Sequence, residues 1–65
     1  MGEIPIMRFF EYSHLPDHLK EVSQPFCELA LWMVAHLPNT AERSAGLRKL
    51  LEAKDCAVRA RLESK

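Results

Sequence analysis

The apolar side chains of residues 28–37 point in every direction around the helix that their spacing predicts. One stripe holds Leu29, Ala30, Met33 and Leu37, and other directions are taken by Leu31, Trp32 and Ala35. A surface helix needs only one apolar stripe, and this segment is much shorter than the roughly 20 residues that span a bilayer. We therefore expect this helix to be buried on several sides. Because so short a chain offers little else to cover it, we also expect self-assembly.

A first helix is predicted over residues 16–37, with a break or kink near Pro25. Pro16 suits the first turn of a helix, where its missing N–H costs nothing. Ser23 can cap a second start whose first turn contains Pro25, so that the helix stops and begins again at this point. The same residues also fit one helix that is kinked at Pro25. Both alternatives stay open.

A second helix is predicted over residues 40–63, because alanine, leucine, glutamate, lysine and arginine dominate this segment. Leu37 precedes Pro38, and a residue before proline avoids helical geometry, so the first helix should end there. Asn39, with Glu42 three residues later, resembles a capping box at the start of the second helix. Two helices of similar length joined by a short turn are typical of an antiparallel helical hairpin.

Residues 1–15 are predicted to form an extended arm, because Pro5 and the clustered aromatic side chains disfavour helix. These aromatic residues are Phe9, Phe10 and Tyr12. They can pack on the hairpin as part of its core, or Tyr12 can stack on a nucleobase. The predicted fold is therefore all-α: an antiparallel helical hairpin over residues 16–63, preceded by a short extended or helical segment and assembling as a homo-oligomer.

Length and composition indicate one small domain. The core of a 65-residue chain rarely supplies more than a few kcal/mol, which again favours a homo-oligomer. Nine basic and nine acidic residues give zero net charge, so a nucleic acid polymer is not an expected partner, and neither is a membrane. No leader-like segment opens the sequence, which predicts a cytoplasmic protein. Cys27 and Cys56 lie among apolar helical residues and are expected to be free, buried thiols.

The sequence offers no recognisable catalytic or metal-binding arrangement. There is no Ser-His-Asp set, and two glycines, Gly2 and Gly46, cannot form a phosphate-binding loop. His14 and His18 are four residues apart, but Pro16 lies between them and no Cys or Glu stands at metal-ligand spacing. We therefore expect a binding protein and not an enzyme, with no cofactor and no metal ion.

Three cations fall close to one line of the second predicted helix, which also carries leucines. They are Arg43, Lys54 and Arg61, separated by 11 and 7 residues. Their charged ends can reach water at the edge of an oligomer interface while their stems cover apolar surface. Alternatively, they can surround a pocket for phosphate. The spacing favours the first interpretation but does not exclude the second.

Two motifs, in order along the chain, resemble a known family. Residues 42–53 read E-R-S-A-G-L-R-K-L-L-E-A, and residues 10–16 read F-E-Y-S-H-L-P. These are similar to the E-R-S-x-A-L-x-K-L-x-E-A pattern and the F-x-Y-H-x-P opening of the sponge proteins with which phages counter CBASS and Thoeris defence. The likeness covers roughly residues 10–60. Gly46 stands where alanine is usual, and one extra residue precedes His14.

The resemblance implies a small helical protomer that assembles, commonly as a hexamer, and sequesters cyclic oligonucleotides or cyclic ADP-ribose-type immune messengers without cleaving them. Within this sequence, Arg43 and Ser44 stand at the start of the second helix, where free N–H groups and partial positive charge favour phosphate. Tyr12 is the candidate for stacking on a base, and Lys20 or Arg48 for neutralising phosphate nearby. The rival hypothesis is an oligomeric interaction module without a nucleotide ligand.

Overall fold

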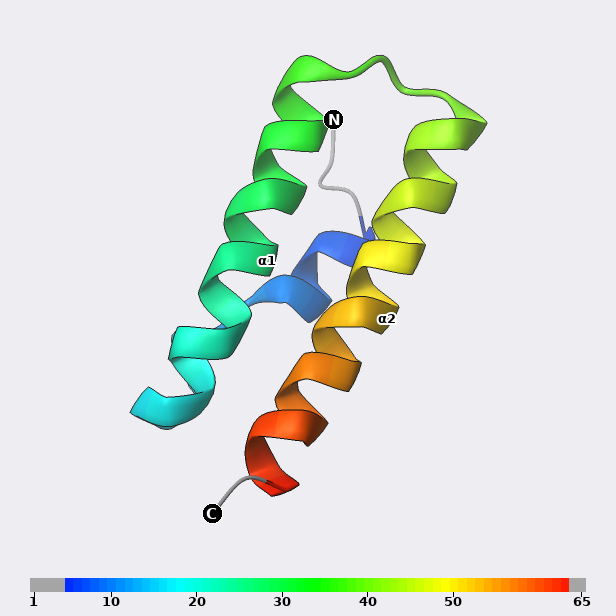
Figure 1. The fold of residues 1–65 in the computed structure, drawn as a ribbon. Helices are drawn as coiled ribbons and strands as arrows, with labels where there is room; N and C mark the ends of the chain where they lie inside the picture. The colour runs from blue at the N-terminus through cyan, green and yellow to red at the C-terminus, as the bar shows by residue number, and fades with distance from the viewer. Residues whose placement is uncertain (1–4, 64–65) are drawn as a thin grey trace.

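The computed structural model describes residues 5–63, and all of its regular elements are helical. A 3-10 helix, η1, spans Pro5–Phe10, and two long α-helices follow: α1 over Asp17–His36 and α2 over Ala41–Glu63. Figure 1 shows α1 and α2 side by side and antiparallel, joined by one short connection. The predicted helical hairpin is confirmed. No helix in this part of the chain is both long and apolar enough to cross a membrane.

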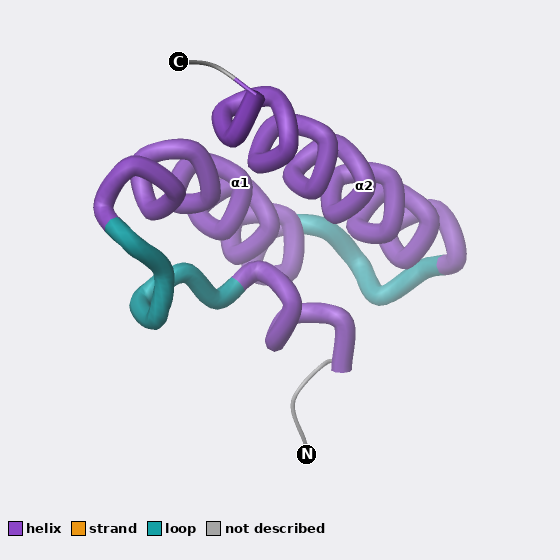
Figure 2. The backbone as a smooth tube through the Cα atoms, turned by 90° about the horizontal axis from the view of Figure 1, so that it is seen from below, coloured by secondary structure: helices purple, strands orange, loops and turns teal. Residues whose placement is uncertain are grey.

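The N-terminal segment is not extended as predicted, because residues 5–10 form η1. Proline at the first position of a helical turn is favourable, since its φ angle is already fixed near the helical value. The turn also brings Phe10 inward, where its side chain is fully buried. Figure 2 shows η1 crossing one side of the helix pair. Residues 11–15 lack regular structure, and residues 1–4 of the predicted arm lie outside the described range.

Helix α1 runs through Pro25 without a break. The restart capped by Ser23 is therefore wrong, and the single-helix alternative is right. Ser23 lies in the middle of α1 with its side chain buried, so its hydroxyl cannot serve as a cap. Pro25 is exposed and has no N–H to donate to the preceding turn. Phe26 and Cys27, directly after Pro25, pack against the core, and most of the stability of a protein helix comes from such tertiary packing.

The core of the protomer is small. Each helix supplies one fully buried apolar side chain: Phe10 from η1, Ala30 from α1 and Leu47 from α2. Half-buried residues surround them, namely Ile6, Met7, Phe26, Cys27, Met33, Val34, Leu50 and Leu51. At Gly46 the two long helices come close, because a Cβ there would stand 3.1 Å from the terminal methyl carbon of Met33. This crossing fixes how α1 and α2 face each other.

Helix α1 is buried within the protomer on one side only. Leu29, Leu31 and Trp32 remain 48%, 55% and 50% exposed. The sequence predicted that residues 28–37 would be covered on several sides, and a single chain does not provide that cover. Exposed large apolar side chains in a soluble domain commonly mark surfaces that associate.

Candidate functional site

A pocket of about 430 Å³ lies where the start of α2 meets η1. It is open to solvent, and both apolar and basic side chains line it. The lining residues are Pro5, Ile6, Asn39, Arg43, Ser44, Leu47 and Arg48. Three of the five ligand-binding residues predicted from the sequence, Arg43, Ser44 and Arg48, therefore share one wall on α2.

The start of α2 is fixed by Thr40 and not by the Asn39–Glu42 pair. The Thr40 Oγ1 accepts a hydrogen bond from the backbone N–H of Arg43 (3.2 Å), which is the bond that an N-cap side chain makes. The Thr40 carbonyl accepts the N–H of Ser44 (3.1 Å). The capping prediction was thus one residue too early. The consequence is that Arg43 and Ser44 occupy the first turn of a well-formed helix.

The guanidinium group of Arg43 joins the end of α1 to the start of α2. Its Nη1 donates to the carbonyls of Val34 (3.3 Å) and Leu37 (3.1 Å), and its Nη2 donates to the Asn39 Oδ1 (3.1 Å). Carbonyls at the last turn of a helix have no helical donor, and a cation there is also favourable to the helix dipole. Arg43 therefore stabilises the hairpin in addition to lining the pocket.

Arg43 still has donor capacity after these contacts. A guanidinium carries five N–H groups, and three of them go to the oxygens of Val34, Leu37 and Asn39. The Arg43 Nε is buried and has no hydrogen-bond partner among residues 5–63. The Nε–H and one N–H of Nη2 are therefore left without a protein partner among these residues.

Ser44 and Arg48 lie one turn apart along α2, and both are exposed. Residues four apart on a helix share a face, so a hydroxyl and a guanidinium point to the same side of the pocket. Ile6 and Leu47 offer apolar surface beside them. The combination of cations, a hydroxyl and apolar surface suits a ligand that has both a phosphate and a flat apolar ring.

Tyr12 and Lys20 do not line this pocket. Tyr12 is half-buried in the connection between η1 and α1, and its carbonyl accepts the N–H of Leu15 (3.0 Å). Lys20 is half-buried in the first turns of α1. Because the hairpin is antiparallel, the start of α1 and the start of α2 lie at opposite ends (Figure 1). One protomer alone does not bring all five predicted residues together.

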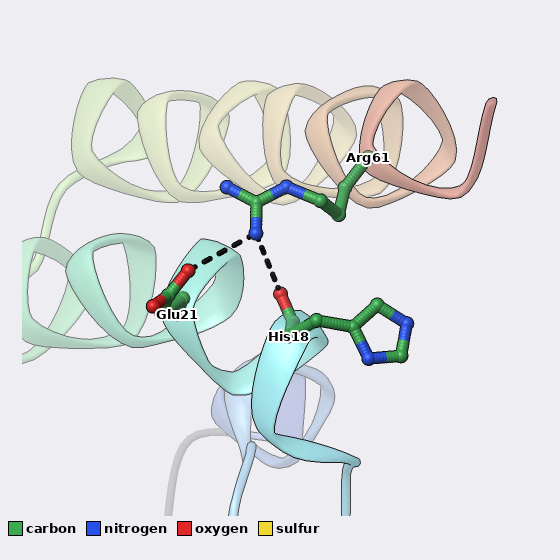
Figure 3. A network of polar contacts seen from close by, with 3 residues as sticks. All are labelled: His18, Glu21 and Arg61. Atoms are coloured by element: carbon green, nitrogen blue, oxygen red, sulfur yellow. Dashed lines mark hydrogen bonds and ion pairs between the residues drawn. The ribbon is translucent and has the colours of Figure 1, made fainter. Parts of the chain in front are cut away.

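Two members of the line of cations, Arg43 and Arg61, contact α1 or the residue directly after it, and so stabilise the hairpin within the protomer. At the open end, the Arg61 Nη1 donates to the His18 carbonyl (3.2 Å) and to the Glu21 Oε1 (3.0 Å), as Figure 3 shows. Between the two arginines, Lys54 forms an ion pair with Asp55 (3.3 Å). The arginines thus hold the hairpin at its two ends, which neither interpretation of the line anticipated.

Both cysteines are free, but only one is shielded. Cys27 is half-buried, and burial raises the pKa of its thiol, with a smaller contribution from the carboxylates of Glu28 and Glu11. Cys56 is exposed on α2, contrary to the expectation that both thiols are buried, and the Arg59 Nη2 donates to its sulfur (3.4 Å). Within residues 5–63, no group of three His, Cys, Asp or Glu side chains could hold a metal ion.

Sequence reasoning missed the residues that form the rest of the pocket. Pro5 and Ile6 line the pocket because η1 packs across the helix pair. No local sequence pattern predicts this packing. Asn39 was assigned to the cap, yet it lines the pocket and accepts a hydrogen bond from Arg43. The position of Asn39 in the loop directly after Pro38 could have indicated a role in the pocket, because loop residues often contribute to binding sites.

Comparisons with known proteins return no match: no family model, no curated protein and no solved structure is similar to this chain. Membership of the sponge family therefore stays a prediction, which rests on the two sequence motifs at residues 10–16 and 42–53.

Proposed function

We propose that this protein is a non-catalytic sponge that binds cyclic oligonucleotides or cyclic ADP-ribose-type messengers and thereby counters antiphage defence. The observation that carries the proposal is that Arg43, Ser44 and Arg48 line one pocket. All three were already candidate ligand-binding residues on the sequence alone. Arg43 and Ser44 belong to the E-R-S motif of the family resemblance, and Arg48 follows one turn later.

The pocket has the chemistry that a cyclic nucleotide needs. Phosphate would lie near the N-terminus of α2, where the partial positive charge of the helix dipole favours an anion. Arg48 would neutralise it, and a base would cover Ile6 and Leu47. A volume of about 430 Å³ falls within the range of small-molecule sites, roughly 300–1,000 Å³.

Self-assembly completes the proposed site. The pocket is open, so one protomer would leave a ligand partly in water. Tyr12, in the connection before α1, and Lys20, in the first turns of α1, would approach that ligand from a neighbouring copy. We propose a homo-oligomer, with the hexamer of the resembled family as the working stoichiometry. In this arrangement Tyr12 stacks on a base while Lys20 adds positive charge.

The second candidate function is an oligomeric interaction module without a nucleotide ligand. The exposed Leu29 and Trp32 favour it, because neighbouring large apolar side chains at a helix surface suit contact with a partner whether or not the pocket binds anything. The two candidates differ in one measurable respect. A ligand that binds only the folded protein must raise its melting temperature.

Melting curves with a panel of cyclic di- and trinucleotides and cyclic ADP-ribose isomers test the proposal. We expect at least one compound to raise the melting temperature, whereas its linear counterpart does not. Arg48→Ala should abolish the shift, and Lys49→Ala is the matched control because Lys49 is an exposed neighbouring cation that does not line the pocket. A shift that is equal in both variants would contradict the proposed site, and no shift with any compound would favour the interaction module.

A further inference from the structure

Helix α1 also carries a line of side chains that the rest of residues 5–63 leaves largely uncovered. The line consists of His18, Val22, Pro25, Leu29, Trp32 and His36, and we name it the outer seam. Five of its six members are exposed, and Val22 is half-buried. Its residues are separated alternately by four and three positions, which is the spacing with which one helix packs against another in a coiled coil.

The outer seam contains no Asp, Glu, Lys or Arg, although charged residues make up 28% of the chain. Exposed helix faces are normally charged or polar. Leu29 and Trp32 at its centre are each about half exposed, with 48% and 50% of their surface accessible. An uncharged line that runs nearly the whole length of a 20-residue helix is suited to contact with another helix.

Trp32 and His36, the aromatic end of the outer seam, are held in one conformation within the protomer before any partner binds. The rings of Trp32 and His36 stack with centroids 4.6 Å apart and planes 17° from parallel. The His36 Nδ1–H donates to the Trp32 carbonyl (2.9 Å), which fixes the imidazole. Side chains that are already held in one conformation lose less entropy when a partner covers them.

The outer seam is complementary to itself. Its arrangement of residue classes is symmetric, with a histidine at each end and four apolar residues between them. When two copies of α1 run antiparallel with His18 of one beside His36 of the other, all six positions are paired, and Trp32 meets Val22 of the second copy. A two-fold symmetric interface requires a patch that complements itself in this way. Antiparallel helices also have opposed, mutually favourable dipoles.

We infer that the outer seam is a self-association surface, at which a second copy of this chain packs its α1 antiparallel to the first. A standard interface buries about 800 Å² per partner, about one sixth of the 4780 Å² that the protomer exposes. This inference specifies the contact behind the proposed self-assembly, and it does not depend on whether the pocket binds a nucleotide.

Sedimentation velocity on three proteins tests the surface: the unmodified chain, Leu29→Glu and Leu31→Glu. The two variants are matched, because both leucines lie on α1 with similar exposure, 48% and 55%, and only Leu29 belongs to the outer seam. A buried, unpaired carboxylate is strongly unfavourable. We expect Leu29→Glu to raise the dissociation constant of the oligomer at least about tenfold, whereas Leu31→Glu leaves it unchanged.

The other sedimentation results would refute either self-assembly itself or only the outer seam as its contact surface. A monomeric unmodified chain would refute self-assembly and the seam together. An oligomer that Leu29→Glu does not weaken, or that both variants weaken equally, would refute the seam alone. Nucleotide binding is measured separately on the unmodified chain, so failure of the ligand proposal is not confused with failure of the interface.

Disulfide trapping tests the antiparallel orientation without placing a charge in the interface. Both native cysteines are first removed by Cys27→Ser and Cys56→Ser. One chain then carries His18→Cys and a mass tag, and a second, untagged chain carries His36→Cys. Mild oxidation of the mixture should yield mainly the tagged–untagged disulfide dimer. Dimers that link two copies of the same chain equally well would refute the antiparallel arrangement.

Discussion

The guanidinium of Arg43, in the first turn of α2, donates a hydrogen bond of 3.1 Å to the carbonyl of Leu37, directly beyond the end of α1. The same group also bonds Val34 and Asn39. One side chain thus closes the hairpin and lines the pocket. The closing role should affect the stability of the ligand-free protein, and the pocket role should affect its affinity for ligand.

Arg43→Ala should lower the stability of the ligand-free protein as well as its affinity for ligand. Hydrogen bonds to a charged group contribute roughly 1.5–3 kcal/mol, and we expect a loss of about that size by urea denaturation. Arg48→Ala should change stability by less than about 0.5 kcal/mol, because an exposed side chain is removed, while it weakens binding measured by calorimetry. Equal stability losses in the two variants would contradict the closing role of Arg43.

Tyr12→Ala should weaken binding about ten- to a hundredfold, and Tyr12→Phe should weaken it much less. Stacking of a base on an aromatic ring contributes roughly 1–3 kcal/mol, and each 1.4 kcal/mol is about tenfold in affinity. Binding and melting are measured on the same samples, since Tyr12 is half-buried. A Tyr12→Ala variant that melts earlier yet binds normally would assign Tyr12 to the core.

Ser23→Ala should stabilise the protein. The Ser23 Oγ is buried with no hydrogen-bond partner among the described residues, and leaving such a group unpaired costs about 1–3 kcal/mol. Alanine is also the better helix former. We expect a gain of about 1 kcal/mol in the free energy of unfolding. Ser44→Ala, at an exposed helical serine, serves as the control and should gain less.

Cys56 should react with a thiol reagent much faster than Cys27 near pH 8. Cys56 is exposed beside Arg59, whereas burial raises the pKa of the Cys27 thiol and so lowers its thiolate fraction. Cys27→Ser and Cys56→Ser variants, labelled separately, give the two rates. As pH rises, the rate at Cys27 should increase over a range above the ordinary pKa of a thiol. Similar rates throughout would mean that α1 does not shield Cys27.

The hairpin could be predicted from the sequence because its determinants are local. Leu37 before Pro38 ends α1 as expected, and the composition of residues 40–63 matches α2, Ala41–Glu63. The error at Pro25 has a tertiary explanation, since Phe26 and Cys27 pack against the core and tertiary packing contributes most of a helix's stability. η1 was missed for a similar reason: burial of Phe10 against both long helices favours a turn that the local residues do not indicate.

The candidate site was predictable only where one helix carries it. Arg43, Ser44 and Arg48 lie within two turns of α2, so their spacing alone places them together. The apolar part of the pocket comes from η1, whose position depends on long-range packing. Tyr12 and Lys20 do not line the pocket, and their proposed approach to the ligand depends on a second copy. Such a contact forms between two chains, so local patterns in one chain's sequence do not predict it.

The most direct test of the central claim is calorimetric titration of the purified protein with the cyclic nucleotide that most raises its melting temperature, followed by denaturation and chromatography of the released ligand. We expect saturable binding that Arg48→Ala weakens and Lys49→Ala does not, with the ligand recovered intact after prolonged incubation. Recovery of a linear or hydrolysed product, or the absence of saturable binding to every cyclic nucleotide in the panel, would contradict the account.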